Sequence, residues 1–320
     1  LELENENTIR AYNHAVRRVQ AWCEDHGLEH SRIMPGVVAS YLKNDLDGSP
    51  ATKKQHRSAI KRYFDLLVVR HISVINPAAS VKTPRLRRLR GTTPMIEADE
   101  IKQLMASIDS TGLAGLRDRA IIAVLGYTAV RAAGIAKLRR GDYRGRPGNM
   151  QLYFREKGGT EHPIEVRADL EQCLGDYLAA ARMKTADKDC PLFRPLVRKQ
   201  QAFRPWMRAD KKKRTPEQGT LSPNDVCRMV KRRMRRAGLR EELSAHSFRV
   251  AVLTDLIDQG VPIEDVQQLA GHADARTTKL YDRTNRKVTR NLVERIRLQL
   301  TTSEDSVTVP EHTAEVRSVL

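Results

Sequence analysis

The sequence lacks the markers of several common protein classes. Its 320 residues contain four cysteines, which form no Cys-x-x-Cys pair: Cys23, Cys173, Cys190 and Cys227. Such scattered thiols argue against a disulfide scaffold and against a zinc site. No run approaches the roughly 20 apolar residues of a membrane-spanning helix, and no repeat of solenoid length is apparent. We therefore expect a soluble globular protein, long enough for two domains.

Acidic residues are scarce relative to basic ones. The chain has 57 Lys and Arg against 39 Asp and Glu, which gives a formal net charge of +18. Such a chain is attracted to a polyanion and binds it in a salt-dependent way. Residues 1–6 lack the basic and apolar pattern of a secretion signal. These features predict a cytoplasmic protein whose partner is a nucleic acid.

Four residues with complementary chemistry follow one another in the C-terminal part of the chain: His246, Arg249, His272 and Tyr281. An arginine stays charged at physiological pH and can hold two phosphate oxygens at once. A tyrosine hydroxyl is neutral at pH 7 and needs a base or cationic neighbours to react, and His246 is a candidate acceptor of its proton. The set favours attack on a phosphodiester by a phenol, with arginine and histidine in place of a metal.

The first two of these residues are predicted to lie at the start of a helix. Apolar residues recur at helical spacing over 248–257, with Ser247 as the predicted N-cap and Gly260 as the end. His246 and Arg249 are then close to the unpaired backbone amides of a helix N-terminus, which favour an anion.

The other two residues follow shorter elements. A helix is predicted after Pro262 and ends at Gly271, so that His272 comes directly after it. The segment 277–281 is too short to be stable alone, which predicts a position for Tyr281 that can be regulated.

The order and approximate spacing of the His-x-x-Arg, Gly-His and tyrosine positions resemble tyrosine recombinases of the phage integrase and Xer type, over most of the chain. The resemblance implies an early arginine, which matches Arg131 after the apolar segment that begins at Ala120. Family members usually carry an acidic residue three positions later, where this chain has Gly134.

The resemblance also implies a lysine on a β-hairpin. Residues 150–166 alternate as two strands with a glycine turn, and Lys157 at this turn is the match. Arg155 and His162 are weaker candidates for the same role.

The mechanism implied by the resemblance is transesterification. Tyr281 attacks a scissile phosphate to form a covalent 3′-phosphotyrosyl link, and the freed 5′ hydroxyl then attacks the link of a partner strand. Five residues would assist: the phosphate clamp Arg131 and Arg249, the hydrogen-bond donor His272, the proton acceptor His246 and the leaving-group acid Lys157. No nucleotide cofactor or metal is expected.

Composition divides the chain. Residues 82–94 are basic, contain a glycine and are bracketed by prolines, which predicts an exposed linker. We expect a helical core-binding domain at 1–81, a catalytic domain at 95–300 and a polar tail at 301–320. The predicted fold is mainly α with a small β-sheet, and the cationic stretch 198–214 is predicted to be a loop.

Periodic segments predict the remaining helices at 8–25, 34–46, 50–69, 97–108, 116–125, 169–183 and from Ser222 onward. The candidates for DNA contact lie on the third helix and on the linker: His56, Arg57, Lys61 and Arg62, and Lys82, Arg85, Arg87, Arg88 and Arg90. A second basic run, 231–236, fits a solvated face and a DNA contact equally well.

The expected partner is double-stranded DNA with specific recombination sites. The resemblance implies a homotetramer on two such sites, in a bacterial or phage nucleoid, and allows an accessory DNA-bending protein. An amphipathic helix at 288–300 fits docking on a neighbour and packing on its own domain equally well.

Two other functions remain open. A type IB topoisomerase uses similar chemistry to relax DNA, although the N-terminal helices favour the recombinase. A non-catalytic DNA-binding regulator on the same scaffold is the second alternative, and Gly134 in place of the acidic residue leaves it open.

Overall fold

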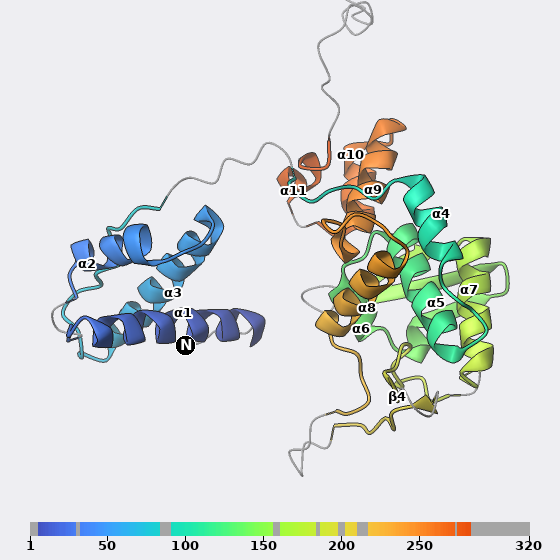
Figure 1. The fold of residues 1–320 in the computed structure, drawn as a ribbon, viewed down its shortest axis with the longest axis horizontal. Coiled ribbons are helices and arrows are strands. Elements are labelled where there is room, and N and C mark those ends of the chain that lie inside the picture. The colour runs from blue at the N-terminus through green and yellow to red at the C-terminus, as the bar shows by residue number, and fades with distance from the viewer. Residues whose placement is uncertain are drawn as a thin grey trace, which may run out of the picture. The chain divides into compact units, whose positions relative to one another are not determined.

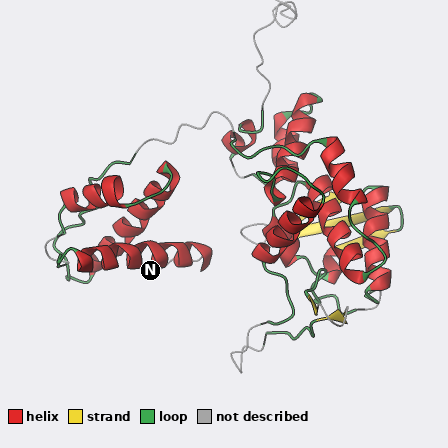
Figure 2. Cartoon of the chain, viewed as in Figure 1, coloured by secondary structure: helices red, strands yellow, loops and turns green. Residues whose placement is uncertain are grey.

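The computed structural model forms two compact units, residues 1–89 and 90–320. It describes residues 6–29, 33–83, 91–155, 161–183, 186–197, 202–209, 217–272 and 274–282. Both units are mainly helical, and the strands lie in the second (Figures 1 and 2). The predicted fold class is confirmed. Among the described helices, none has the length and hydropathy needed to span a bilayer.

The first unit contains α1 (Glu6–Asp25), α2 (Pro35–Ser40), the π-helical turn η2 (Tyr41–Asp45) and α3 (Pro50–Val69). Both bounds predicted for α3 are confirmed. Its start is fixed because the Ser49 side chain accepts a hydrogen bond from the amide of Thr52 and Pro50 occupies the first turn. The core of the first unit is a cluster of apolar side chains from all these elements, including Val19, Tyr41, Leu42, Ile60 and Phe64.

His56 is turned into this core. Its side chain is 4% exposed, and its Nδ1 lies 3.3 Å from the Tyr41 hydroxyl. Burial, followed by the charges of Arg18 and His14, lowers the pKa of His56. The prediction that His56 belongs to an outward, DNA-facing surface is therefore wrong, because His56 shares the inner face of α3 with Ile60, one helical turn later.

The other predicted DNA contacts have different positions. Arg57 donates from Nη2 to the carbonyl of Ala79 over 3.0 Å, and Lys61 pairs with Asp65 at 2.9 Å. Arg62 and Lys82 are exposed. The predicted linker contacts Arg85, Arg87, Arg88 and Arg90 lie outside the described residues.

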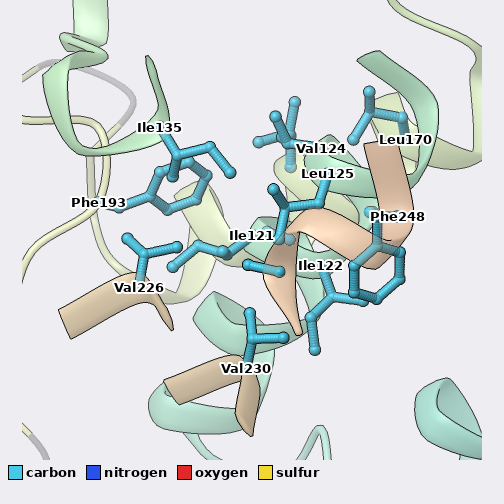
Figure 3. Close-up of a cluster of buried hydrophobic side chains, with 14 of the residues drawn as sticks. Ile121, Ile122, Val124, Leu125, Ile135, Leu170, Phe193, Val226, Val230 and Phe248 are labelled. Atoms are coloured by element: carbon cyan, nitrogen blue, oxygen red, sulfur yellow. The ribbon is translucent and has the colours of Figure 1, made fainter. Parts of the chain in front are cut away.

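The second unit is built around α5 (Leu113–Thr128), which is apolar on nearly every side. Its residues Ile121, Ile122, Val124 and Leu125 are surrounded by side chains of α6 (Ala132–Lys137), α7 (Ala168–Ala180), α8 (Pro223–Arg236) and α9 (Ala245–Asp258) (Figure 3). A helix buried on nearly every side is the scaffold from which the surrounding elements are positioned. The helix α4 (Ala98–Ala106) precedes it.

A small antiparallel sheet follows η3 (Arg140–Asp142), in the order β1 (Tyr143–Arg146), β2 (Asn149–Arg155) and β3 (Glu161–Glu165). Leu152, Phe154 and Ile164 point into the core, as the alternation in the sequence predicts. The predicted hairpin is confirmed, with Phe154 paired to His162. Residues 156–160, which connect the two strands in the sequence and include Lys157, lie outside the described residues.

The last described elements are α9, α10 (Ile263–Ala270) and α11 (Ala275–Lys279). The predicted N-cap of α9 is wrong, because the helix begins after Ser244. The amide of Ser244 donates to the Ser247 hydroxyl over 3.0 Å, so Ser247 supports the cap from inside the first turn. The predicted end of α10 at Gly271 is confirmed, with φ of 57° at that glycine.

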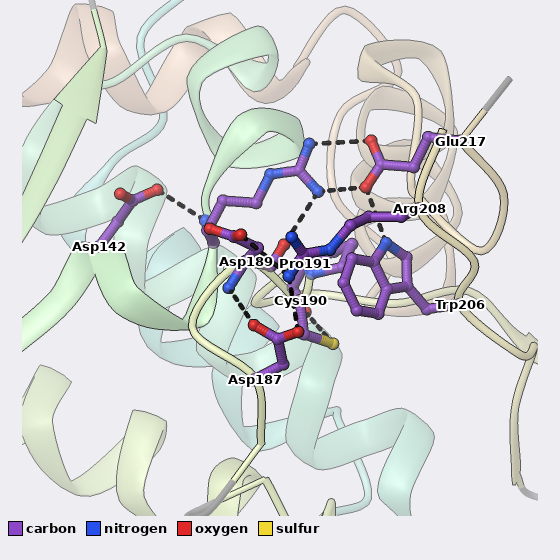
Figure 4. A network of polar contacts seen from close by, with 9 residues as sticks. Asp142, Asp187, Asp189, Cys190, Pro191, Trp206, Arg208 and Glu217 are labelled. Carbon is purple, nitrogen blue, oxygen red and sulfur yellow. Dashed lines mark hydrogen bonds and ion pairs between the residues drawn. The ribbon is translucent and has the colours of Figure 1, made fainter. Parts of the chain in front are cut away.

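Part of the predicted cationic loop forms a strand. The segments β4 (Leu196–Val197) and β5 (Ala202–Phe203) pair with each other. A polar network connects Trp206, Arg208 and Glu217 to earlier residues of the second unit (Figure 4). In it Glu217 accepts from Arg139 Nη2 over 2.9 Å and from Trp206 Nε1 over 2.7 Å, and Arg208 pairs with Asp187 at 2.7 Å.

Candidate active site

Five of the six predicted catalytic residues come together in the second unit: Arg131, His246, Arg249, His272 and Tyr281. Three of them, Arg131, Arg249 and His272, line a pocket of about 670 Å³ between α6, the sheet and α10. The hydroxyl of Tyr281 lies 3.4 Å from Nε2 of His246. The sixth residue, Lys157, lies outside the described residues.

Arg249 is the most deeply buried of these groups, with 2% of its surface exposed. Its Nη1 donates to the carbonyl of Ala129 over 2.5 Å, and its Nη2 donates to the carbonyl of Ala270 over 2.6 Å. Both carbonyls belong to helix ends, since Ala129 is the left-handed C-cap of α5 and Ala270 closes α10. The ends of two helices therefore fix the guanidinium in place.

His272 accepts the next hydrogen bond of this arginine. Its Nε2 lies 2.6 Å from Arg249 Nη2, and its Nδ1 lies 2.9 Å from the hydroxyl of Thr278. Burial, followed by the charges of Arg249, Arg131 and His246, lowers the pKa of His272 to about 4. The ring is therefore neutral at pH 7.

Tyr281 is seated in the site of its own chain. It is 8% exposed, and its ring stacks on His272 with 5.6 Å between centroids. Its carbonyl accepts from Thr254 Oγ1 over 3.2 Å, and the carbonyl of the preceding Leu280 accepts from the amide of Gly91 over 3.0 Å. Two backbone carbonyls and a stacked ring therefore hold Tyr281 with its hydroxyl facing His246.

His246 faces the hydroxyl of Tyr281 from the first turn of α9. The side chain of His246 is open to solvent on one side. Burial of the rest of the ring, followed by the charges of Arg249 and Arg131, lowers its pKa. A lowered pKa keeps the imidazole neutral near pH 7, the state in which it can accept a proton.

Gly134 lines the same pocket. A Cβ added there would lie 2.4 Å from Cγ2 of Val130, so a side chain at this position requires Val130 to move. The pocket wall instead contains Glu264, from the first turn of α10, together with Gln267 and Gln268. These polar residues were not foreseen from the sequence.

The weaker candidates for the lysine role also line the pocket, and both have protein partners. Arg155 Nη2 lies 3.2 Å from a carboxylate oxygen of Asp142, and His162 Nε2 lies 3.3 Å from the carbonyl of Leu269. Within the described residues, no group of three or more His, Cys, Asp or Glu side chains has the geometry of a metal site.

Sequence reasoning missed two threonines of the site. Thr254 and Thr278 are buried and bond to Tyr281 and His272. Thr278 precedes Tyr281 by three residues, a helical spacing that could have indicated a shared face. The carbonyls of Ala129 and Ala270 have no sequence signal, because every residue has one.

The chain resembles known proteins over most of its length. The model of the phage integrase family matches residues 94–287, and that of the N-terminal SAM-like domain of phage integrases matches residues 1–71. The chain is 26% identical over 286 residues to tyrosine recombinase XerC 2 of Ralstonia nicotianae, which covers 86% of this chain and 76% of that protein.

Two solved structures resemble the fold. The XerH site-specific recombinase bound to its difH substrate has a TM-score of 0.65 and 19% identity, covering 89% of this chain and 78% of that one. A lambda integrase tetramer bound to a Holliday junction has a TM-score of 0.60 and 17% identity, covering 90% and 76%.

Proposed function

The chain belongs to the phage integrase family of tyrosine recombinases, enzymes that break and rejoin DNA, and we propose that it exchanges strands between two specific DNA sites through a covalent link to Tyr281. One observation carries the proposal: the Tyr281 hydroxyl lies 3.4 Å from a histidine of lowered pKa, beside two arginines of the same chain. A nucleophile, a base and a phosphate clamp are thus assembled within one protomer.

In the proposed first step, a scissile phosphate enters the pocket between Arg131 and Arg249. These guanidiniums hold its non-bridging oxygens and stabilise the charge that develops on them. The Tyr281 oxygen bonds to phosphorus as its proton passes to His246, and the bond to the 5′ oxygen breaks. Lys157 supplies a proton to that leaving oxygen.

In the second step the 5′ hydroxyl of a partner strand attacks the phosphorus of the 3′-phosphotyrosyl link and gives its proton back to Lys157, as the bond from phosphorus to the Tyr281 oxygen breaks. The reaction is the reverse of the first, so Tyr281 recovers its proton from His246. One phosphodiester is formed for each one broken. The sequence of steps therefore consumes no nucleotide.

The DNA contacts and the assembly are part of the proposal. We place the DNA clamp in residues 1–81 and the reaction in 95–300, joined by the basic linker 82–94. Arg57, Lys61 and Lys82 offer cations for the duplex. The XerH and lambda integrase relatives are seen on DNA, the latter as a tetramer, which supports four copies of this chain on two double-stranded sites.

The test is a denaturing gel that detects protein covalently attached to nicked DNA. The substrates are taken from the ends of the element that carries the gene, and Tyr281→Phe is compared with wild type. We expect a 3′-linked adduct that disappears in Tyr281→Phe. The matched control is Tyr127→Phe, which removes a half-exposed hydroxyl bonded to Asp169 and leaves the adduct unchanged.

The same assay separates the alternatives. Relaxation of any supercoiled plasmid, without a preferred site, would indicate a topoisomerase. Specific DNA binding by wild type without any adduct would indicate a non-catalytic regulator and overturn the proposal.

A further inference from the structure

Thr278 joins two parts of the site. It lies on α11, three residues before Tyr281, and its side chain is completely buried. The Tyr281 amide donates to the carbonyl of Thr278 over 3.0 Å, while the Thr278 hydroxyl lies 2.9 Å from Nδ1 of His272. One short turn therefore carries the tyrosine and a direct contact to the second histidine.

The contacts of His272 determine which of its nitrogens carries a proton. Arginine is only a donor, so the 2.6 Å contact from Arg249 Nη2 requires a lone pair on Nε2 of His272. In the neutral ring the proton is then on Nδ1, and it is donated to the hydroxyl oxygen of Thr278. The pKa of His272, lowered to about 4, agrees with a neutral ring.

This arrangement must change when a phosphate arrives. A phosphate oxygen is an acceptor, so Nε2 of His272 can bond to it only when Nε2 carries the proton and Nδ1 has the lone pair. A hydroxyl can serve both states, because it accepts from Nδ1–H in one and donates to Nδ1 in the other. In this change Nδ1 gives one proton to water and Nε2 takes one proton from water, so the ring stays neutral.

We propose that Thr278 is a positioning residue that holds the His272 ring in both states and sets which nitrogen carries its proton. The role rests on the proposed function of His272 as a donor to the phosphate. It has a consequence for the nucleophile: displacement of α11 would remove Tyr281 and the partner of His272 together. The phosphate clamp would then be complete only while the tyrosine is seated.

The first test is ¹⁵N NMR of the imidazole groups in DNA-free protein, with His272 assigned by loss of its signal in His272→Gln. We expect wild type to show Nδ1 protonated and Nε2 unprotonated. Thr278→Val keeps the shape but removes the hydroxyl, so it shifts this balance, whereas Thr278→Ser preserves it. Thr277→Val makes the same change one residue earlier on α11 and should leave the spectrum unchanged.

The second test is the single-turnover rate of adduct formation on nicked DNA. Thr278→Val should be about tenfold slower, as expected for one lost hydrogen bond to a reacting group, at an unchanged half-saturating DNA concentration. Thr278→Ser should recover most of the rate. The acid side of the pH profile of this rate should shift only in Thr278→Val. The shift acts through the His272 ring, which also faces Arg249, Arg131, His246 and Tyr281.

The outcomes separate this inference from the proposed function. An unchanged spectrum and rate in Thr278→Val, or equal losses in Thr278→Val and Thr278→Ser, would overturn the role of Thr278. A spectrum that shifts as expected while wild type forms no adduct supports the contact of Thr278 and overturns the recombinase chemistry instead.

Discussion

Two buried arginine centres of the second unit are built in opposite ways. At one, the carboxylate of Asp118 gathers three guanidiniums: Arg117 at 2.7 Å, Arg233 at 2.8 Å and Arg232 at 3.5 Å. At the other, Arg249 donates to two backbone carbonyls and to an imidazole, all of them neutral. The first centre pairs its arginines with an anion of the protein, and the second holds Arg249 through neutral acceptors.

The difference separates a structural use of arginine from a functional one. A buried carboxylate that pairs with guanidiniums joins α5 to α8, and these arginines are held by an anion of the protein itself. A guanidinium held by helix-end carbonyls keeps its positive charge and can direct it at an incoming phosphate. Changes at the two centres should therefore have different effects on the reaction, on stability and on the response to pH.

The largest expected effect is on the reaction. Arg249→Ala removes a phosphate clamp, so adduct formation should slow by about 10³-fold, equivalent to about 4 kcal/mol. The measurement is the single-turnover cleavage rate. Arg233→Ala, the matched change at the Asp118 centre, should leave the rate per folded molecule near wild type; equal losses in both variants would remove the contrast.

Asp118→Asn should act on stability instead. It leaves three guanidiniums around a neutral amide, with Arg117 and Arg233 almost buried, so the free energy of unfolding should fall by about 3 to 4 kcal/mol. Chemical denaturation measures this change. The contrast would fail if folded Asp118→Asn formed adduct as slowly as Arg249→Ala.

The third prediction concerns pH. The pKa of His272 is about 4 in the folded chain, because of burial and then the neighbouring Arg249, against 6.5 when unfolded. The unfolded chain therefore binds the proton first as pH falls. The stability contributed by this site is complete above pH 6.5 and should decline by about 3 kcal/mol by pH 4.

Denaturation of wild type and His272→Gln across this pH range isolates the contribution. The difference between the two free energies of unfolding should change with pH as described. A constant difference would mean that neither burial nor Arg249 disfavours the protonated ring.

The smallest expected effect is at Arg232. Its side chain is 45% exposed, and burial followed by the competing charges of other arginines outweighs the attraction of Asp118, so that its pKa is lowered. Arg232→Gln should therefore change the free energy of unfolding by no more than about 0.5 kcal/mol. A loss as large as that of Asp118→Asn would show that all three guanidiniums are needed.

The sequence predicts elements well where a local signal is strong. Proline after a capping serine set the start of α3, and Gly271 set the end of α10. The N-cap of α9 was misplaced because two serines, Ser244 and Ser247, stand three residues apart and both take part in the cap. Composition alone cannot choose between them.

The site was only partly predictable for a different reason. Reactive side chains are recognisable by type and order, and five of them converge in the structure. Their supports are not, since the carbonyls of Ala129 and Ala270 can come from any residue. The prediction for His56 was wrong for a similar reason. Helical spacing assigns residues to faces of a helix, but the burial of this face depends on packing against another segment, here Tyr41.

The burial of Tyr281 has a consequence for the proposed covalent intermediate. A nucleophile that is 8% exposed, stacked on His272, would leave a phosphate ester in an equally sheltered position. Water then has little access to the ester, whereas a strand end delivered by the DNA itself can approach from the pocket. In the proposed reaction the broken strand would thereby be preserved for rejoining, and a permanent nick would be the rarer outcome.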